Sequence, residues 1–453
     1  MRTGVVALAL ALLVLAPLRP ARAQFSFDAR RVGMGGVSMS RDGNVRRYNP
    51  AYRAVKNRSN VSGAPKFSIP IPLGLIDFLK EHPLNQLGDD PMFDPKSPEF
   101  NPVELMNLIF NPPIFYEVKK SPAPTNDVEF TVGRNQLILN LGGTRVLIPE
   151  QKFGLGSTSR LLDMGFGFAG FHIGVMGFLQ YDAGFTLDST LRAFLTDTLV
   201  GALPLTDYAI NTDAVVQAGL APTVGYAGRI LRGAGGDESD DGFYLGGALH
   251  YYLGATYGRV VGPAGFTTGP VVMASTPALL VDGNLLTSNK ANGHGIGGDV
   301  GIAWISGPFE VGFGVNDIGA ELTWSDTKIQ RIVYDTAGDS VAISLLVNHV
   351  TTKTKLPITY IGNAALRMGT GTTVGADVVN SGRGVVIHVG AEQRYGPFAV
   401  RGGVSRDQRK KMQFGVGGGL RFGSVGLDVG LWTHSNSMAT QRGVTLATSI
   451  SIY

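Results

Sequence analysis

The last third of the chain is a succession of short segments in which apolar residues alternate with glycine or charged residues. Between Met412 and Phe422 the apolar positions all have one parity, and the positions of the other parity are Gln413, Gly415, Gly417, Gly419 and Arg421. Successive side chains of a strand point to opposite faces, so such a segment has one apolar face and one polar face. The pattern predicts antiparallel strands, and both soluble sandwiches and membrane barrels produce it.

The start of the chain has the three parts of a secretory signal peptide. Arg2 supplies a positive charge, an apolar run extends to Leu18, and Ala21-Arg22-Ala23 places small residues around a cleavage site. We therefore predict a signal peptide over residues 1–23 and a mature protein that begins near Gln24, outside the cytoplasm. No later stretch reaches the roughly 18 consecutive apolar residues of a membrane-spanning helix.

Composition narrows the class of protein. The chain has 39 Lys+Arg and 35 Asp+Glu, and three of the arginines lie in the signal peptide, so no basic excess remains that would indicate a nucleic-acid partner. It has no cysteine, which excludes disulfides, a lipid-anchored cysteine and thiolate chemistry. In lipid every backbone polar group must be paired within the protein. An exported chain that is rich in glycine and in which apolar and polar residues alternate therefore indicates an all-β fold. We predict an antiparallel transmembrane β-barrel in the bacterial outer membrane.

The lengths of the connections support this interpretation. Short connections at Ser306–Pro308, Gly369–Gly371, Tyr395–Pro397 and Phe422–Ser424 alternate with longer ones, and residues 258–293 are expected to form a very long loop. Outer-membrane barrels have short periplasmic turns and longer external loops. We expect about 14 strands, within a range of 14–18.

The alternation also assigns residues to the two faces of the expected barrel. Apolar side chains such as Leu249 and Phe313 are expected on the lipid side, with Trp324, Trp432 and Tyr395 near the membrane interfaces. Polar side chains expected to line the lumen are Arg367, Asp377, His388, Glu392, Arg394, Arg401, Arg421 and Asp428. Both signs of charge are present, so no strong preference for anions or cations is indicated.

The mature N-terminus carries a two-part motif. A Gly-Met-Gly-Gly run at Gly33, Met34, Gly35 and Gly36 is followed by Asn49, Pro50 and Ala51. This arrangement resembles the N-terminus of the FadL-like outer-membrane transporters of long-chain fatty acids and other hydrophobic compounds. PorV-like proteins of a secretion system and TraF-like proteins of conjugation operons have similar N-termini.

The resemblance implies an organisation for the whole chain. In the FadL-like family this segment forms a plug inside a 14-stranded barrel, and a shift of the plug is thought to release ligand. The resemblance would make residues 24–58 an N-terminal plug segment and residues 59–453 the barrel. Independently of the family, glycines let a chain fold tightly in a crowded lumen, and Asn-Pro favours a turn.

Two expected external loops contain apolar residues at helical spacing. One helix is predicted over residues 102–110, in a loop region that also contains Leu79. A second is predicted over Thr190–Val200 with Ser189 as its cap. The resemblance implies that such loops form an apolar groove that captures ligand, and the alternative is that they only cover the barrel mouth. The candidate groove residues are Leu79, Leu105, Ile109, Phe110, Leu191, Phe194 and Leu195.

Other motifs do not indicate chemistry. Gly165–Gly170 and Gly293–Gly298 fit G-x-G-x-x-G, but neither lies between a strand and a helix of a βαβ unit. We therefore predict no cofactor, no metal site and no catalytic residues, and the protein is not expected to be an enzyme. The function expected first is passive uptake of hydrophobic molecules, with outer-membrane lipid and a hydrophobic ligand as partners. The alternatives are an accessory barrel with secretion or conjugation partners, and a barrel enzyme whose site assembles across strands.

Overall fold

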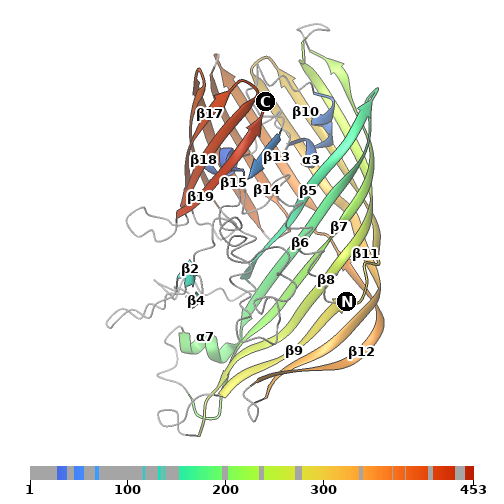
Figure 1. The fold of residues 1–453 in the computed structure, drawn as a ribbon, viewed down its shortest axis with the longest axis vertical. Coiled ribbons are helices and arrows are strands. Elements are labelled where there is room, and N and C mark those ends of the chain that lie inside the picture. The colour runs from blue at the N-terminus through green and yellow to red at the C-terminus, as the bar shows by residue number, and fades with distance from the viewer. Residues whose placement is uncertain are drawn as a thin grey trace, which may run out of the picture.

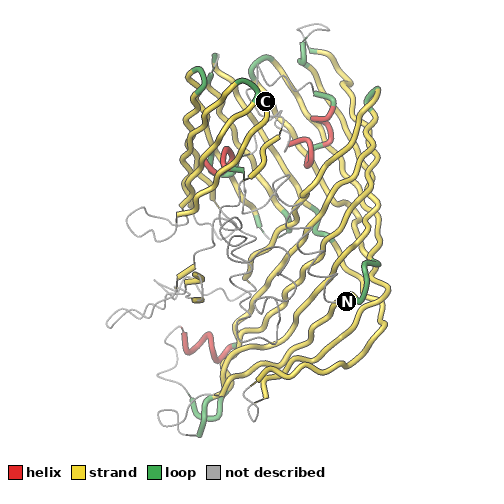
Figure 2. Tube along the Cα trace, viewed as in Figure 1, coloured by secondary structure: helices red, strands yellow, loops and turns green. Residues whose placement is uncertain are grey.

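The computed structural model describes most of the C-terminal two thirds of the chain and parts of its N-terminal third. The described residues are 28–37, 45–55, 67–70, 116–117, 131–133, 136–137, 153–195, 203–233, 239–270, 278–335, 340–369, 371–382, 384–406, 412–433 and 444–453. Strands dominate them, and the few helices are short (Figure 2). None of these helices is long and apolar enough to cross a membrane.

A single antiparallel sheet of sixteen strands forms the body of the molecule (Figure 1). Its strands are β1 Phe67–Pro70, β5 Phe153–Phe168, β6 Phe171–Leu187, β7 Asp207–Arg232, β8 Gly242–Thr267, β9 Ala278–Ser288, β10 Gly293–Ser306, β11 Phe309–Asp335, β12 Ser340–Lys355, β13 Thr359–Met368, β14 Thr372–Asn380, β15 Val385–Tyr395, β16 Phe398–Arg406, β17 Met412–Phe422, β18 Val425–Thr433 and β19 Val444–Ile452. Three further strands, β2 Tyr116–Glu117, β3 Thr131–Gly133 and β4 Gln136–Leu137, form a small separate sheet.

Fourteen of the sixteen strands follow one another along a continuous hydrogen-bonded path. The path begins at β1, continues from β19 back to β13, passes through β11, β10 and β8, and ends with β7, β6 and β5. Strands β9 and β12 lie off this path, because β9 pairs with β8 and β11, and β12 pairs with β11. The sheet curls around the helix α3 Val45–Tyr48 (Figure 1). The prediction of a mostly antiparallel β fold is therefore confirmed.

The prediction of a very long loop over residues 258–293 is wrong. Strand β8 continues to Thr267, β9 occupies Ala278–Ser288, and β10 begins at Gly293. Strands β7, β8 and β11 have 26, 26 and 27 residues, whereas a tilted strand crosses a bilayer in about 9–11 residues. The apolar/polar alternation fades in the distal halves of these strands, which is why the sequence pattern there resembled a loop.

The tight turns gather at one end of the sheet, at the top of Figure 1. Gly307, Gly369, Gly396 and Gly423 each occupy one of these turns with a φ between 53° and 60°. This left-handed conformation costs glycine little and suits the short turns of hairpins. The expected segregation of the short connections is thus present in the described part of the chain, and we call this edge the short-turn end.

The two faces of the sheet differ sharply in exposure and chemistry. On β8, Leu249 is 62% exposed while its neighbour His250 is 3% exposed. The same alternation places Leu245, Tyr251, Ile302, Trp304, Phe309, Val311 and Phe313 on an exposed outer face. Polar side chains fill the inner face, which is buried and contacts the N-terminal part of the chain. An exposed apolar surface of this extent is unusual for a soluble monomer and typical of a surface that contacts lipid.

Two of the three aromatic residues expected near the membrane interfaces are instead buried on the inner face. Trp324 stacks on Tyr257, and Trp432 packs with Ala29 and Val32. That prediction is wrong for both tryptophans, because the polar character of the inner face is interrupted at these positions by apolar clusters. Tyr395 is exposed, beside a short turn.

Candidate functional site

The candidate site is the inner face of the sheet where the N-terminal segment packs against it. We use "N-terminal segment" for the described residues 28–37 and 45–55. The segment contains the helix α2 Ala29–Gly33, the helix α3 Val45–Tyr48 and the 3-10 helix η2 Pro50–Arg53. Its two parts lie against different strands, so the segment is held at two separate places.

The first anchor consists of α2 and the Gly-Met-Gly-Gly run against β15–β19. The backbones approach so closely that only glycine fits on both sides. A Cβ atom on Gly417 would lie 2.9 Å from the Cα atom of Gly33, and one on Gly403 would lie 2.1 Å from the carbonyl oxygen of Met34. The glycines at alternating positions of these strands therefore make room for the N-terminal segment.

A buried carboxylate joins this anchor to the sheet. Arg30 of α2 donates from Nε to Oε2 of Glu392 at 3.0 Å, and Arg401 donates to the same oxygen at 2.6 Å. Arg394 donates to the other oxygen, Oε1, at 2.9 Å. Arg401 also lies 2.6 Å from Asp428. Three guanidinium groups thus share Glu392, and only one of them belongs to the N-terminal segment.

Asp377 and His388, both predicted to line the lumen, form an ion pair beside the same anchor. The Nδ1 atom of His388 is 2.5 Å from Oδ1 of Asp377, and the two residues are opposite each other on β14 and β15. A Cβ atom on Gly36 would lie 2.8 Å from the ring of His388. Gly36, the last residue of the glycine run, therefore packs against the imidazole ring of His388.

The second anchor consists of α3 and η2 against β8, β10, β11 and β13. Asn49 caps η2 by accepting from the backbone N–H of Ala51 at 3.1 Å, and its Nδ2 donates to the carbonyl of Ile302 at 2.9 Å. Asn363 donates to the hydroxyl of Tyr52 at 2.9 Å. Pro50 occupies the first position of η2, where its missing N–H has no consequence.

A second buried ion cluster, which the sequence did not predict, supports this anchor. Arg160 pairs with Asp299 and lies 3.0 Å from Asp317. His250 is 2.8 Å from Asp299, and Tyr252 donates to Asp317 at 2.7 Å. Arg160 also donates to the carbonyl of Arg47 at 2.6 Å. The cluster joins β5, β8, β10 and β11, and its assembly depends on register shifts between β10 and β11 and on the positive φ of 59° at Asp317.

An apolar cluster lies on the inner face beyond this ion cluster. We call it the aromatic cluster, and its buried members are Met176, Phe178, Ala221, Tyr252, Tyr257, Ala320, Leu322, Trp324 and Leu356. Tyr257 and Trp324 stack with their ring centres 5.4 Å apart. The indole N–H of Trp324 donates to Thr354 at 3.1 Å. Packed apolar side chains thus occupy this part of the interior, where a water-filled channel would be lined by polar groups.

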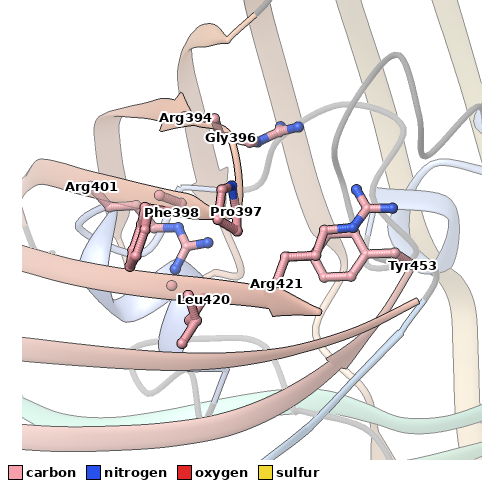
Figure 3. Close-up of a pocket in the computed structure, with 10 residues that line it drawn as sticks. Arg394, Gly396, Pro397, Phe398, Arg401, Leu420, Arg421 and Tyr453 are labelled. Carbon is pink, nitrogen blue, oxygen red and sulfur yellow. The ribbon is translucent and has the colours of Figure 1, made fainter. Parts of the chain in front are cut away.

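The remaining predicted inner-face residues lie near the short-turn end. Arg367 pairs with the buried Glu310. Arg421 is half-buried, and its Cζ atom lies 4.2 Å from the centre of the Tyr453 ring. Arg394, Arg401, Arg421 and Tyr453 line a pocket of about 250 Å³, in which Figure 3 shows the guanidinium group of Arg421 beside the tyrosine ring.

Most of the predicted external groove lies outside the described residues. The candidate groove residues outside the described part of the chain include Leu79, Leu105, Ile109 and Phe110. The helix expected over Thr190–Val200 is observed as α7 Ser189–Leu195, with Leu191 buried; the side chains of Phe194 and Leu195 lie outside the description. Its cap is Asp188, whose Oδ1 accepts from the N–H of Leu191 at 2.5 Å, so the prediction of Ser189 as the cap is wrong.

The described residues contain no group of three or more acidic, histidine or cysteine side chains that could hold a metal ion. The carboxylates of the two ion clusters are engaged in ion pairs with arginines and in hydrogen bonds. These contacts serve to fix strands and the N-terminal segment.

Comparison with known proteins gives distant structural similarity only. No family model matches the chain, and no curated protein matches it. The toluene transporter TbuX of Ralstonia pickettii is 12% identical, with 67% of this chain and 89% of that chain covered and a TM-score of 0.31. The toluene transporter TodX of Pseudomonas putida is 10% identical, with 66% and 80% covered and a TM-score of 0.32. A mutant porin of Rhodopseudomonas blastica is 12% identical, with 62% and 99% covered and a TM-score of 0.21.

Proposed function

We propose that this protein is an outer-membrane channel that lets hydrophobic molecules pass by passive diffusion through the interior of a β-barrel. In this proposal residues 24–58 form a plug, residues 59–453 form the barrel, and release of ligand follows a shift of the plug. The observation that carries the proposal is the aromatic cluster on the inner face, next to a segment anchored at two places. An aqueous pore is lined by polar groups, whereas a passage for hydrophobic molecules requires an apolar lining.

The exposed outer face supports the membrane part of this proposal. We expect Leu249→Arg to destabilise the folded protein in phospholipid vesicles by about 2–4 kcal/mol, the cost of an arginine on the lipid face near the bilayer midplane. The matched control is Leu345→Arg on β12, where the strand extends far from the short-turn end and the side chain is also exposed. Urea unfolding monitored by tryptophan fluorescence measures both. Equal free energies of unfolding for the two variants would contradict a lipid-facing position for Leu249.

The interior part of the proposal is tested by uptake. Cells without a transporter of their own would express the chain and be given labelled dodecanoate or labelled toluene. We expect faster entry than in cells with an empty vector. Because the aromatic cluster fills the interior in this structure, removing its largest side chain by Trp324→Ala should raise the initial rate by a few-fold.

Trp304→Ala is the matched control, because Trp304 is 49% exposed on the outer face of the neighbouring strand β10. It should leave uptake unchanged. If a correctly inserted protein gives no more uptake than the vector, the channel proposal fails. An accessory role in a secretion or conjugation system would then be favoured.

A further inference from the structure

The pocket at the short-turn end has a composition that neither the ion clusters nor the aromatic cluster explains. It opens between the ends of β15, β16 and β17 and the C-terminal residue of the described chain. Its polar side chains are Arg394, Arg401, Arg421 and Tyr453, and its apolar ones are Pro397, Phe398, Ala399 and Leu420 (Figure 3). It has no acidic lining residue.

Positive charge exceeds negative charge around this pocket. Of its three arginines, Arg401 is held by Glu392 and Asp428, and Arg394 is held by Glu392. Glu392 is already shared with Arg30 of the N-terminal segment. Among the described residues, two side-chain carboxylates, those of Glu392 and Asp428, therefore lie beside four guanidinium groups.

Arg421 is the arginine best placed to bind something else. Its Nε donates to the carbonyl of Gly423 at 2.8 Å, and its plane stacks on the ring of Tyr453. Among the described residues it makes no ion pair. The stacking and the backbone hydrogen bond orient the guanidinium group, and its remaining N–H groups have the fork geometry that matches a carboxylate or a phosphate.

A few apolar residues beside the short turns complete the lining of the pocket, and one of them, Phe398, is 58% exposed at its rim. Pro397 follows the turn glycine Gly396, and Phe398 and Leu420 are directly opposite each other on β16 and β17. A pocket of about 250 Å³ with a cationic end and an apolar side fits the head and first carbons of an amphiphile rather than a whole long chain.

We propose that this pocket is an anion-binding site that takes the carboxylate or phosphate group of a small amphiphile, with Arg421 as the main contact and Tyr453 as the residue that positions it. This site goes beyond the proposed channel function, which concerns hydrophobic molecules whether or not they carry a charge. It also stands independently of that function, because binding at the short-turn end does not require passage through the interior.

Calorimetric titration of the purified full chain in nanodiscs of zwitterionic lipid tests the site. The probes are octanoate, octanol and inorganic phosphate. We expect octanoate to bind and octanol to bind at least about tenfold more weakly, because the guanidinium fork gains a charge-assisted contact only with the anion. Arg421→Gln should weaken octanoate binding by about tenfold or more and leave octanol unchanged.

Arg331→Gln is the control, since Arg331 is exposed, pairs with Asp282, and lies in the distal half of β11. It should leave octanoate binding unchanged. If inorganic phosphate binds as tightly as octanoate and also depends on Arg421, the site is supported and its natural ligand is a free anion. If Arg421→Gln has no effect on either anion, or if octanol competes equally with octanoate, the proposal is overturned, whatever the result of the uptake experiment.

Discussion

A variant that keeps residues 1–27 but lacks residues 28–55 is expected to conduct ions in planar bilayers about tenfold better than the intact protein, or more. The intact N-terminal segment occupies the interior and is anchored to both sides of the inner face. The face uncovered by the deletion is rich in glycine and charged side chains, which water would hydrate. Barrels of 16–18 strands leave an aqueous channel while those of 8 are filled by side chains. In the proposed barrel, a path of fourteen strands would therefore leave space once the segment is gone.

The control for this deletion is a variant that loosens one anchor without removing it. Gly35→Val places a side chain where a Cβ atom would already lie 2.5 Å from the backbone of Val404, at a φ of 68°. It should give brief openings rather than a permanently open pore. A deletion variant that folds, as judged by its shift on unheated gels, and conducts like the intact protein would show that the segment does not close the interior.

Glu392→Gln is expected to lower the free energy of unfolding by about 3–5 kcal/mol, the range for breaking a buried ion pair by removing one partner. The carboxylate is 1% exposed and serves Arg30, Arg394 and Arg401. Loss of the carboxylate charge leaves several guanidinium groups inside the sheet with less negative charge beside them. It also weakens the side-chain link between Arg30 of α2 and β15, because an amide oxygen accepts less strongly than a carboxylate. The variant should therefore conduct more often as well as unfold more easily.

Glu321→Gln is the matched control for that effect. Glu321 lies on β11, is 39% exposed at its side chain, and pairs with Lys353 and Lys355. Exposed pairs of this kind contribute about 0–1 kcal/mol. Urea titration in phospholipid vesicles compares the two variants directly. A cost for Glu392→Gln no greater than that for Glu321→Gln would mean that water reaches the Glu392 cluster, and the account of the first anchor would fail.

The sequence was sufficient to predict the two-faced strands of the C-terminal third. Their side-chain period of two is local, so Asp377, His388 and Glu392 could be assigned to one face without knowing which strands pair. The tight turns could also be predicted, because their glycines interrupt the alternation of apolar and polar residues. The lengths of β8 and β11 could not be predicted. Their distal halves pair with β9 and β12, where the alternation of apolar and polar residues is weak.

The contacts of the candidate site depend on distant parts of the chain. Arg160 and Asp317 meet only because of the order of β5, β8, β10 and β11 and because of a local irregularity at Asp317. The glycines of β16 and β17 were visible as a pattern, but their role in admitting the backbone of Gly33 and Met34 required the structure. Trp432 was misplaced because an aromatic residue near a strand end suits either an interface or an interior cluster. Trp324 was misplaced because β11 continues past it to Asp335, so it does not lie near a strand end.

The central claim is that the interior passes hydrophobic molecules and excludes hydrophilic ones. The most direct test uses liposomes that contain the purified intact chain and compares the entry of labelled toluene or dodecanoate, delivered from a carrier, with the entry of a sugar of similar mass. We expect entry of the hydrophobic probe above that of protein-free liposomes and no entry of the sugar. Entry of the sugar at a porin-like rate, or no protein-dependent entry of either hydrophobic probe, would contradict the account.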